Sequence, residues 1–130
     1  MVFQLWYVRL SSLSRLWLFN QASAECESLF GALANIDPPA TRNYVLNNLL
    51  PFELEVIRTR CAYWAGDHIG YLDDLSALLN RCKIKSRKAR EISESSMWKE
   101  RGARMSLIIA SHLVEMKVGF YLYFCLNKQT

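Results

Sequence analysis

The sequence predicts an all-α protein built from antiparallel helical hairpins. Its 130 residues include 19 Leu but only six Val, seven Ile and three Thr. Leucine favours helices and β-branched residues favour strands, so this composition argues against a sandwich or a doubly wound sheet. The high apolar content excludes disorder as a description of the whole chain. At this length we expect one domain with one hydrophobic core.

The first hairpin is expected over about residues 2–36. Apolar residues recur at helical spacing from Val2 to Leu16, and a second stripe of the same period follows. Asn20 is the predicted N-cap of the second helix, and Asp37-Pro38-Pro39 is predicted to end it. The loop around Trp17 is so short that the two helices must pack antiparallel. The second stripe consists of Ala22, Cys26, Leu29, Phe30 and Leu33.

The second hairpin is expected over about residues 51–82, after a less regular stretch at 40–50. Pro51 suits the first position of a helix, and acidic residues in the next turn suit the helix dipole. Gly66-Asp67 marks the turn, and the partner helix runs to about Cys82. The expected buried residues are Phe52, Val56, Ile57, Cys61, Tyr63 and Trp64 in the first helix, and Ile69, Leu72, Leu75, Leu78 and Leu79 in the second.

One long helix is expected over about residues 95–117, with Ser95 or Ser96 as its N-cap. Its stripe is the firmest in the chain and contains Met105, Ile108, Ile109, His112, Leu113 and Met116. Residues 118–130 then form a divergent apolar tail, which is apolar on all sides and contains strand-like residues. We interpret the chain, on this pattern, as a piece of a longer array of helices.

The positive charge of the chain is concentrated between the second hairpin and the long helix. Residues 81–104 carry a net charge of +6, whereas the whole chain carries +4. Residues 81–90 are predicted to form a basic connector, which could bind nucleic acid, anionic membrane or an acidic protein, or could simply be solvated. The candidate interaction residues are Arg81, Lys83, Lys85, Arg87, Lys88 and Arg90 in this connector, and Phe120, Tyr121, Tyr123 and Phe124 in the tail.

No catalytic, metal or cofactor motif occurs in the sequence. There is no GxSxG, P-loop, GxGxxG, HExxH or CxxC pattern. His68 lies near Asp73 and Asp74, but this trio is better read as a helix start beside solvent-facing acids, and His112 as a core or interface residue. The four cysteines are expected to be reduced thiols in or near the core, in the cytosol or nucleus. We therefore expect no enzyme, no metal, no cofactor and no small-molecule substrate.

Two stretches have to be weighed as membrane or targeting signals. Residues 107–126 are largely apolar, but His112, Glu115 and Lys117 interrupt them, and a spanning helix needs about 20 apolar residues. The first 24 residues contain two Arg, four Ser and no acid, which also fits a mitochondrial transit peptide. A transmembrane helix is therefore disfavoured for residues 107–126, and an ordinary buried helix is preferred to a transit peptide for the first 24 residues, although both alternatives stay open.

The helical hairpins resemble tetratricopeptide repeats, which are helix–turn–helix units of about 34 residues. Trp6, Phe19 and Ala22 fall at the tryptophan, tyrosine and small-residue positions of the repeat, but Leu10 replaces its usual glycine. Trp98 and Gly102 fit a later repeat with a shift of one position. This resemblance implies a fragment of an α-solenoid built from degenerate repeats.

A series of short motifs occurs in order along about residues 4–117: Leu5-Trp6-Tyr7-Val8-Arg9-Leu10, Leu18-Phe19-Asn20-Gln21-Ala22, Leu50-Pro51-Phe52, Gly66-Asp67, Leu72-Asp73, Ser96-Met97-Trp98-Lys99-Glu100-Arg101, Arg104-Met105 and Met116-Lys117. In this order the motifs resemble the subunit-12 family of the trafficking protein particle (TRAPP) complexes. The connector at 81–95 is shorter than in that family. Residues 118–130 do not follow the family, and we interpret this tail as a different end of the coding region.

The resemblance implies a non-catalytic subunit of a vesicle-tethering assembly in endoplasmic reticulum-to-Golgi traffic, cytoplasmic and associated with those membranes through its complex. Its implied partners are protein subunits of that assembly, with nucleic acid disfavoured. The expected function is therefore protein–protein scaffolding. The alternative is a basic helical adaptor that binds nucleic acid or anionic membrane through residues 81–104.

Overall fold

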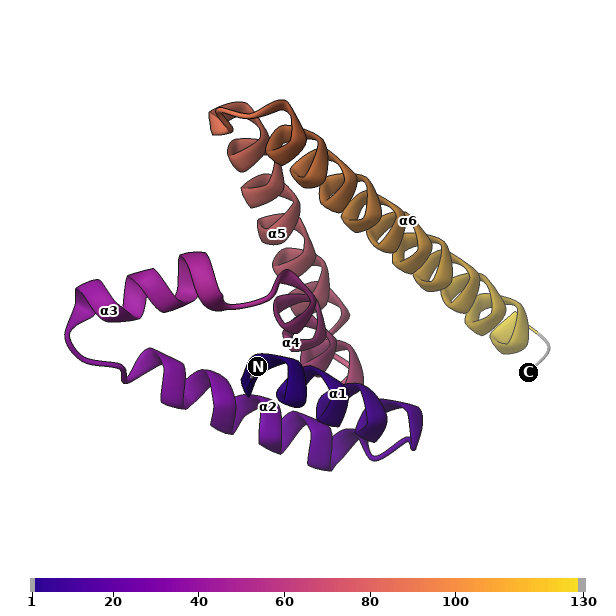
Figure 1. The fold of residues 1–130 in the computed structure, drawn as a ribbon. Helices are drawn as coiled ribbons and strands as arrows, with labels where there is room; N and C mark the ends of the chain where they lie inside the picture. The colour runs from indigo at the N-terminus through magenta and orange to yellow at the C-terminus, as the bar shows by residue number, and fades with distance from the viewer. Residues whose placement is uncertain (1, 129–130) are drawn as a thin grey trace. The chain divides into compact units, whose positions relative to one another are not determined.

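The computed structural model describes residues 2–128, and every regular element in that range is helical (Figure 1). This confirms the all-α class. The chain forms two compact units that meet in sequence at Tyr71 and Leu72. The elements are α1 (Val2–Arg15), α2 (Phe19–Ala34), α3 (Pro39–Tyr44), a π-helical turn (Val45–Leu49), α4 (Phe52–Trp64), α5 (His68–Lys88) and α6 (Ile92–Lys128).

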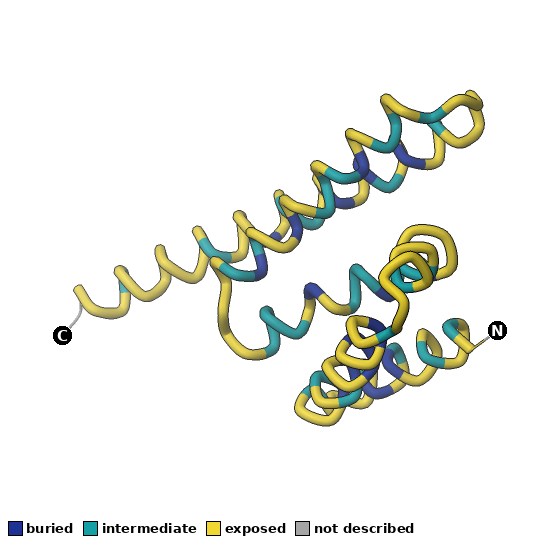
Figure 2. The backbone as a smooth tube through the Cα atoms, turned by 90° about the vertical axis from the view of Figure 1, so that its left-hand side faces the viewer, coloured by how far each residue is buried: buried dark blue, intermediate teal, exposed yellow. Residues whose placement is uncertain are grey.

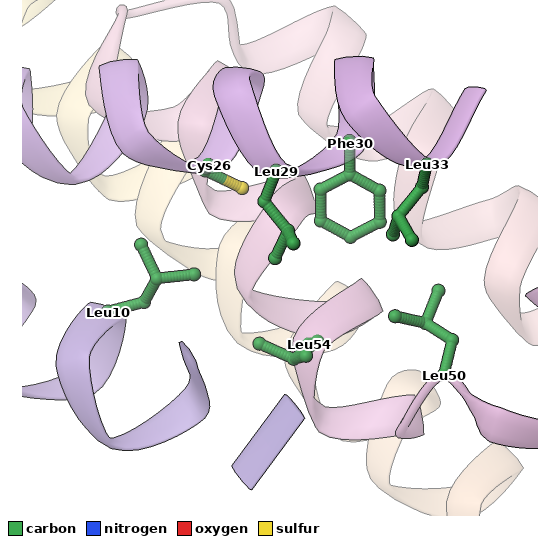
Figure 3. Close-up of a cluster of buried hydrophobic side chains, with 7 residues drawn as sticks. All are labelled: Leu10, Cys26, Leu29, Phe30, Leu33, Leu50 and Leu54. Atoms are coloured by element: carbon green, nitrogen blue, oxygen red, sulfur yellow. The ribbon is translucent and has the colours of Figure 1, made fainter. Parts of the chain in front are cut away.

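Three helices of similar length, α1, α2 and α4, form the first unit by packing against one another. Their apolar faces meet in a core to which α1 contributes Leu10 and α4 contributes Leu54, both fully buried (Figure 3). The ring of Phe19 stacks on that of Trp64 with centroids 5.2 Å apart, which adds a second contact between α2 and α4. The other buried members of the core are Cys26, Leu29, Phe30, Leu33 and Leu50.

The turns that end α1 and α4 have the same backbone hydrogen-bond pattern. After α1, the Leu18 N–H donates to the Leu13 carbonyl and the Trp17 N–H donates to the Ser14 carbonyl. Asp67 and Gly66 make the equivalent bonds after α4, so both turns are Schellman motifs with one left-handed residue. Gly66 takes that conformation at φ 81°, whereas in the first turn Trp17 takes it at φ 64°, which L-residues with a side chain adopt at a cost.

Three local predictions in the first unit are wrong. Asn20 is not an N-cap, because α2 already begins at Phe19 and the carbonyl of Leu18 accepts the first helical bond. Residues 40–49 are helical rather than irregular, because Pro39 starts α3 and the following π-turn packs Val45 and Leu46 on the core. Pro51 precedes α4 as its N-cap instead of being its first residue.

The second unit contains most of α5 and all of α6, which run antiparallel. The Ser95 hydroxyl donates a 3.1 Å hydrogen bond to the carbonyl of Ser86, close to the connector. Farther along, a Cβ built on Gly102 would lie 3.5 Å from the Cβ of Cys82. The contacting residue moves back along α5 from Ser86 to Cys82 while its partner moves forward along α6 from Ser95 to Gly102. The two helices are therefore antiparallel. Buried residues on α6 are Trp98, Gly102, Met105 and His112.

Several predicted boundaries in this part of the chain are also wrong. Helix α5 continues to Lys88 and α6 already begins at Ile92, so the connector has only three residues and Ser95 and Ser96 lie inside α6. On α5, Leu75 is buried as predicted and Leu72, Leu78 and Leu79 are half-buried, but Ile69 is 64% exposed, and the other buried residues are Tyr71 and Cys82. Helix α6 does not stop at residue 117 but continues to Lys128, so the described part of the tail, residues 118–128, is helical. Residues 129 and 130 lie outside the described range.

We predict that Leu10→Ala destabilises the first unit by about 2–5 kcal/mol, because it leaves a cavity among α1, α2 and α4. Urea unfolding followed by tryptophan fluorescence measures this change. Leu5→Ala is the matched control on the same helix, since Leu5 is 68% exposed, and we expect its effect to stay within about 0.5 kcal/mol. Equal effects of the two substitutions would contradict the core described above.

We predict that an ion pair between α1 and α2 makes stability depend on pH. The Arg9 guanidinium donates two hydrogen bonds to Glu25, one of 2.6 Å, and these bonds lower the pKa of the Glu25 carboxyl. A lowered pKa in the folded state stabilises above the unfolded value of about 4.3 and loses that contribution as the pH falls through the folded value. Glu25→Gln should therefore be less stable than wild type at pH 7, and the two should converge in acid.

The measurement for this prediction is the free energy of unfolding in urea from pH 7 down to pH 2.5. Glu27→Gln, an exposed change on the same helix, serves as the control and should follow the wild-type curve. A constant difference between Glu25→Gln and wild type at every pH would rule out the ion pair as its source.

Candidate interaction surfaces

The six basic candidates do not form a loop. Arg81, Lys83, Lys85, Arg87 and Lys88 occupy the last two turns of α5, and only Arg90 lies in the connector. At 100° per residue, Arg81, Lys85 and Lys88 share one side of the helix, while Lys83 and Arg87 share the opposite side. The structure thus divides the basic run between two surfaces.

Two cations lie against the indole of Trp98, a buried residue of α6. The Lys85 ammonium, from α5, is 5.1 Å from a ring centroid of this indole, and the Arg101 guanidinium, from α6 itself, is 4.7 Å away. Both distances lie within the range of cation–π attraction. The Lys85 contact therefore helps to hold α5 against α6, whereas the Arg101 contact lies within α6, so Lys85 of the basic run has a structural role.

The remaining basic side chains lie at the carboxyl end of α5, where cations interact favourably with the helix dipole. Lys83, Arg87, Lys88 and Arg90 are exposed. The basic run contains no aromatic residue on which a nucleic-acid base could stack, and its one large apolar residue is Ile84. The exposed charges can attract an anionic surface, but they lack the elements of base recognition.

The four aromatic candidates lie on the last turns of α6 and are all exposed, Phe120 by 70% and Phe124 by 50%. Phe120 and Phe124 stack with centroids 6.5 Å apart, and the Lys128 ammonium lies 4.8 Å from the Phe124 ring. At 100° per residue, Tyr121 and Tyr123 flank this pair on opposite sides of it. With Val118, Leu122 and Leu126, which are also exposed, they leave no polar side on this segment.

The lengths of α5 and α6 explain why this aromatic segment is uncovered. Two antiparallel helices cover each other only over the length of the shorter one, and α5 has 21 residues while α6 has 37. The 21st residue of α6 is His112, which is also its last buried residue. Residues 113–128, the overhang, extend for about 24 Å. In the part of the chain that the structure describes, the overhang is exposed except for half-buried Met116 and Cys125 (Figure 2).

Helix α6 is also long and apolar enough, by length and composition, to cross a membrane. Only 6% of its most apolar window is buried, so it is not the core helix of this structure. Glu115 and Lys117 lie inside the apolar stretch, where a bilayer interior would penalise both charges. A protein groove can offer these two side chains partners, and this favours a protein surface as the cover of the overhang.

The histidines do not form a metal site. Among residues 2–128 no group of three or more His, Cys, Asp and Glu side chains is placed to hold a metal ion, so His68, Asp73 and Asp74 do not form one. His112 is 3% exposed, and its Nδ1 atom lies 3.8 Å from the carboxylate of Glu115. His112 is the last buried residue of α6 and lies just before the overhang.

One cluster was not predicted as a functional site from the sequence. Cys26 of α2 and Cys61 of α4 interact through their thiols in the first unit, although 35 positions separate them. A hydrogen bond from the Cys26 thiol, with a second from Ser23, lowers the pKa of Cys61 to about 7, and the same contact raises the pKa of Cys26. No spacing rule could have paired them, because the contact arises only when α2 packs on α4.

Comparisons of the chain with protein-family models, with curated proteins and with solved structures find no match.

We predict that Gly102 tolerates alanine but not a long side chain. A Cβ at this position would meet Cys82 at 3.5 Å and Leu79 at 3.8 Å, which is ordinary contact, and alanine favours a helix interior by about 1 kcal/mol over glycine. Gly102→Ala should therefore be neutral or stabilising in thermal unfolding. Gly102→Leu should separate α5 from α6 and destabilise by about 1–3 kcal/mol. Gly119, with no atom within 4 Å, is the control position for the same two changes.

Proposed function

We propose that this chain is a non-catalytic scaffold for protein–protein interaction. The observation that carries the proposal is the overhang at residues 113–128, a helix of about four turns whose apolar surface extends beyond α5, the other helix of its unit. Exposed apolar patches of this kind mark interaction sites on proteins. Aromatic side chains such as Phe120 and Tyr123 are also typical energetic centres of interfaces.

The first unit supports the same proposal through its size and packing. The helix–turn–helix from Val2 to Ala34 is close to the 34-residue length of a tetratricopeptide repeat. The next long helix, α4, packs on both helices of this pair, as successive units do in a helical-repeat array. Helix α6 does not fit that repeat, because a repeat would turn back after about half of the length of α6.

The partner class that we propose follows the resemblance to the TRAPP subunit-12 family. Its motifs fall on defined elements: Leu5–Leu10 lies in α1, Gly66-Asp67 forms the turn before α5, and Ser96–Arg101 lies in α6. We propose on this basis that the partners are subunits of a vesicle-tethering complex in cytoplasmic endoplasmic reticulum-to-Golgi traffic. A helical partner that also pairs Glu115 and Lys117 fits the overhang best.

The alternative, a basic adaptor for nucleic acid or anionic membrane, is favoured by one observation. Lys83, Arg87, Lys88 and Arg90 remain exposed at the end of α5, apart from the Trp98 contact. Binding that neutralises phosphates weakens steeply with added salt, whereas apolar docking of the overhang does not. The salt dependence of binding therefore separates the two functions.

We predict that affinity purification of the full chain from native cells, followed by mass spectrometry, recovers tethering-complex subunits. The double variant Phe120→Gln, Phe124→Gln should lower their recovery at least about tenfold, because it removes two exposed aromatic contacts. The matched control Lys83→Gln, Arg87→Gln should leave recovery within about twofold of wild type at 0.15 M salt.

Each result of this purification decides one part of the proposal. Absence of every tethering-complex subunit would defeat the trafficking assignment. Recovery that depends on the basic pair but not on the aromatic pair would support the adaptor instead. Flotation of the purified chain with neutral phosphatidylcholine vesicles, lost in the aromatic variant, would assign the overhang to a membrane.

A further inference from the structure

We propose that Cys61 and Cys26 form an oxidation site in the first unit, in which a hydroperoxide attacks Cys61 and Cys26 then closes a disulfide between α4 and α2. The site is separate from the overhang and does not depend on the proposed scaffold function.

The placement of the two thiols suits these different tasks. Cys26 is 1% exposed and belongs to the hydrophobic core, whereas Cys61 is half-buried and packs against the edge of that core. Of the two residues, Cys61 is therefore the more accessible to a small oxidant in solution. Cys61 packs against the core cluster to which Cys26 belongs, where α2 and α4 contact each other, so the second thiol is already close to the first when it is oxidised (Figure 3 shows Cys26 in the core).

The surroundings of Cys61 favour its thiolate. Its sulfur accepts hydrogen bonds from the Cys26 thiol and the Ser23 hydroxyl, and the nearby Arg58 adds positive charge, while Glu27 opposes it. Arg58 is held in place by its contact with the Phe30 ring, 4.5 Å from guanidinium to centroid. The net result is a pKa for Cys61 of about 7, and the thiolate is the form that reacts. Low pKa, access and an adjacent second thiol are the usual features of a redox-sensing cysteine.

The reaction balances with one hydroperoxide and no other reagent. The Cys61 thiolate attacks one peroxide oxygen, the O–O bond breaks, and a sulfenic acid forms on Cys61 while hydroxide, or alkoxide from an organic hydroperoxide, leaves. The Cys26 sulfur then attacks the Cys61 sulfur, the S–O bond breaks, and the departing hydroxide takes the Cys26 proton as water. The two sulfurs lose two electrons in total, and the peroxide oxygens gain them.

The disulfide would join two helices whose packing forms the core. Its S–S bond of about 2.05 Å requires the two sulfurs to move from their present contact into bonding distance. The closed loop would contain residues 27–60, including α3 and the π-turn, so oxidation should raise the thermal midpoint of the first unit. Cys82, buried beside Gly102, and Cys125, on the exposed overhang, serve as internal reference thiols.

The direct test is peptide mapping of the folded, reduced full chain after treatment with hydrogen peroxide. Remaining thiols are alkylated, the protein is digested without reductant, and cross-linked peptides are identified by mass. We expect a Cys26–Cys61 pair, two hydrogen masses lighter than the separate peptides, which disappears on reduction. A Cys125→Ser background suppresses links between molecules and should leave this pair unchanged. Recovery of Cys26 and Cys61 in reduced form while Cys125 is oxidised would overturn the proposal.

A pH profile provides a readout that proximity alone would not change. The rate of Cys61 alkylation by iodoacetamide should reach half its plateau near pH 7, whereas an ordinary thiol does so near pH 8.5. At pH 7.4 the thiolate fraction is then about tenfold above that of an ordinary thiol, but the lower basicity reduces intrinsic reactivity about fivefold. The net gain in alkylation rate is only about twofold. The pH at which the rate reaches half its plateau is therefore the quantity that tests the assignment. A midpoint above pH 8 would contradict the assignment of Cys61 as the attacking thiol.

The variants separate the two roles. Cys61→Ser should abolish the disulfide, and Cys26→Ser should leave a sulfenic acid on Cys61 that dimedone traps. Because Cys26 is in the core, circular dichroism must show that Cys26→Ser is folded, and Cys26→Ala is the second choice if it is not. A folded Cys26 variant without a dimedone adduct on Cys61 would disprove the mechanism. The peptide mapping of the wild-type protein tests the proposal whether or not these variants fold.

Discussion

In this protein an apolar helix surface is removed from water only where another helix packs along it. The length over which two helices overlap therefore decides which apolar residues are buried and which stay exposed. In the first unit α1, α2 and α4 have 14, 16 and 13 residues, so each can cover the other two. Their contact removes Leu10 and Leu54 from water completely. In the second unit a helix of 37 residues is paired with one of 21, and burial ends at His112. The same physical rule therefore produces a closed core and an open surface.

The turns determine how the helices reach these positions. Gly66 provides a left-handed residue without strain, and the Asp67 carboxylate then accepts a 2.9 Å hydrogen bond from the Gly70 N–H and caps α5. At the first turn Trp17 adopts the same conformation and contacts Phe19, with ring centroids 6.0 Å apart. Phe19 in turn stacks on Trp64. Aromatic packing around Phe19 accompanies a turn that otherwise suits glycine.

The candidate sites differ in the kind of contact they offer. The end of α5 carries exposed charge, part of which is used internally through Trp98, and the overhang carries exposed apolar surface. Within residues 2–128, neither surface contains a group of three or more side chains placed to hold a metal ion. The Cys26–Cys61 pair has chemical reactivity, but it is built into the packing of two helices. The scaffold function that we propose uses the exposed apolar surface, and the proposed oxidation site lies apart from it in the supporting core.

The sequence by itself determined the features that depend on near neighbours: the helical class from the excess of leucine, the turn at Gly66-Asp67, and the acidic first turn of α4 at Glu53 and Glu55. These follow from backbone preference and from interactions within one helical turn, which a linear pattern records.

Only the tertiary structure decided that the basic run belongs to α5, that Ile69 is exposed, that Val45 and Leu46 pack as a π-turn, and that Cys26 meets Cys61. Each of these depends on which distant helix lies opposite a residue. Packing over 35 positions of chain has no local signature, because the free energy that selects it is gained only when the helices meet.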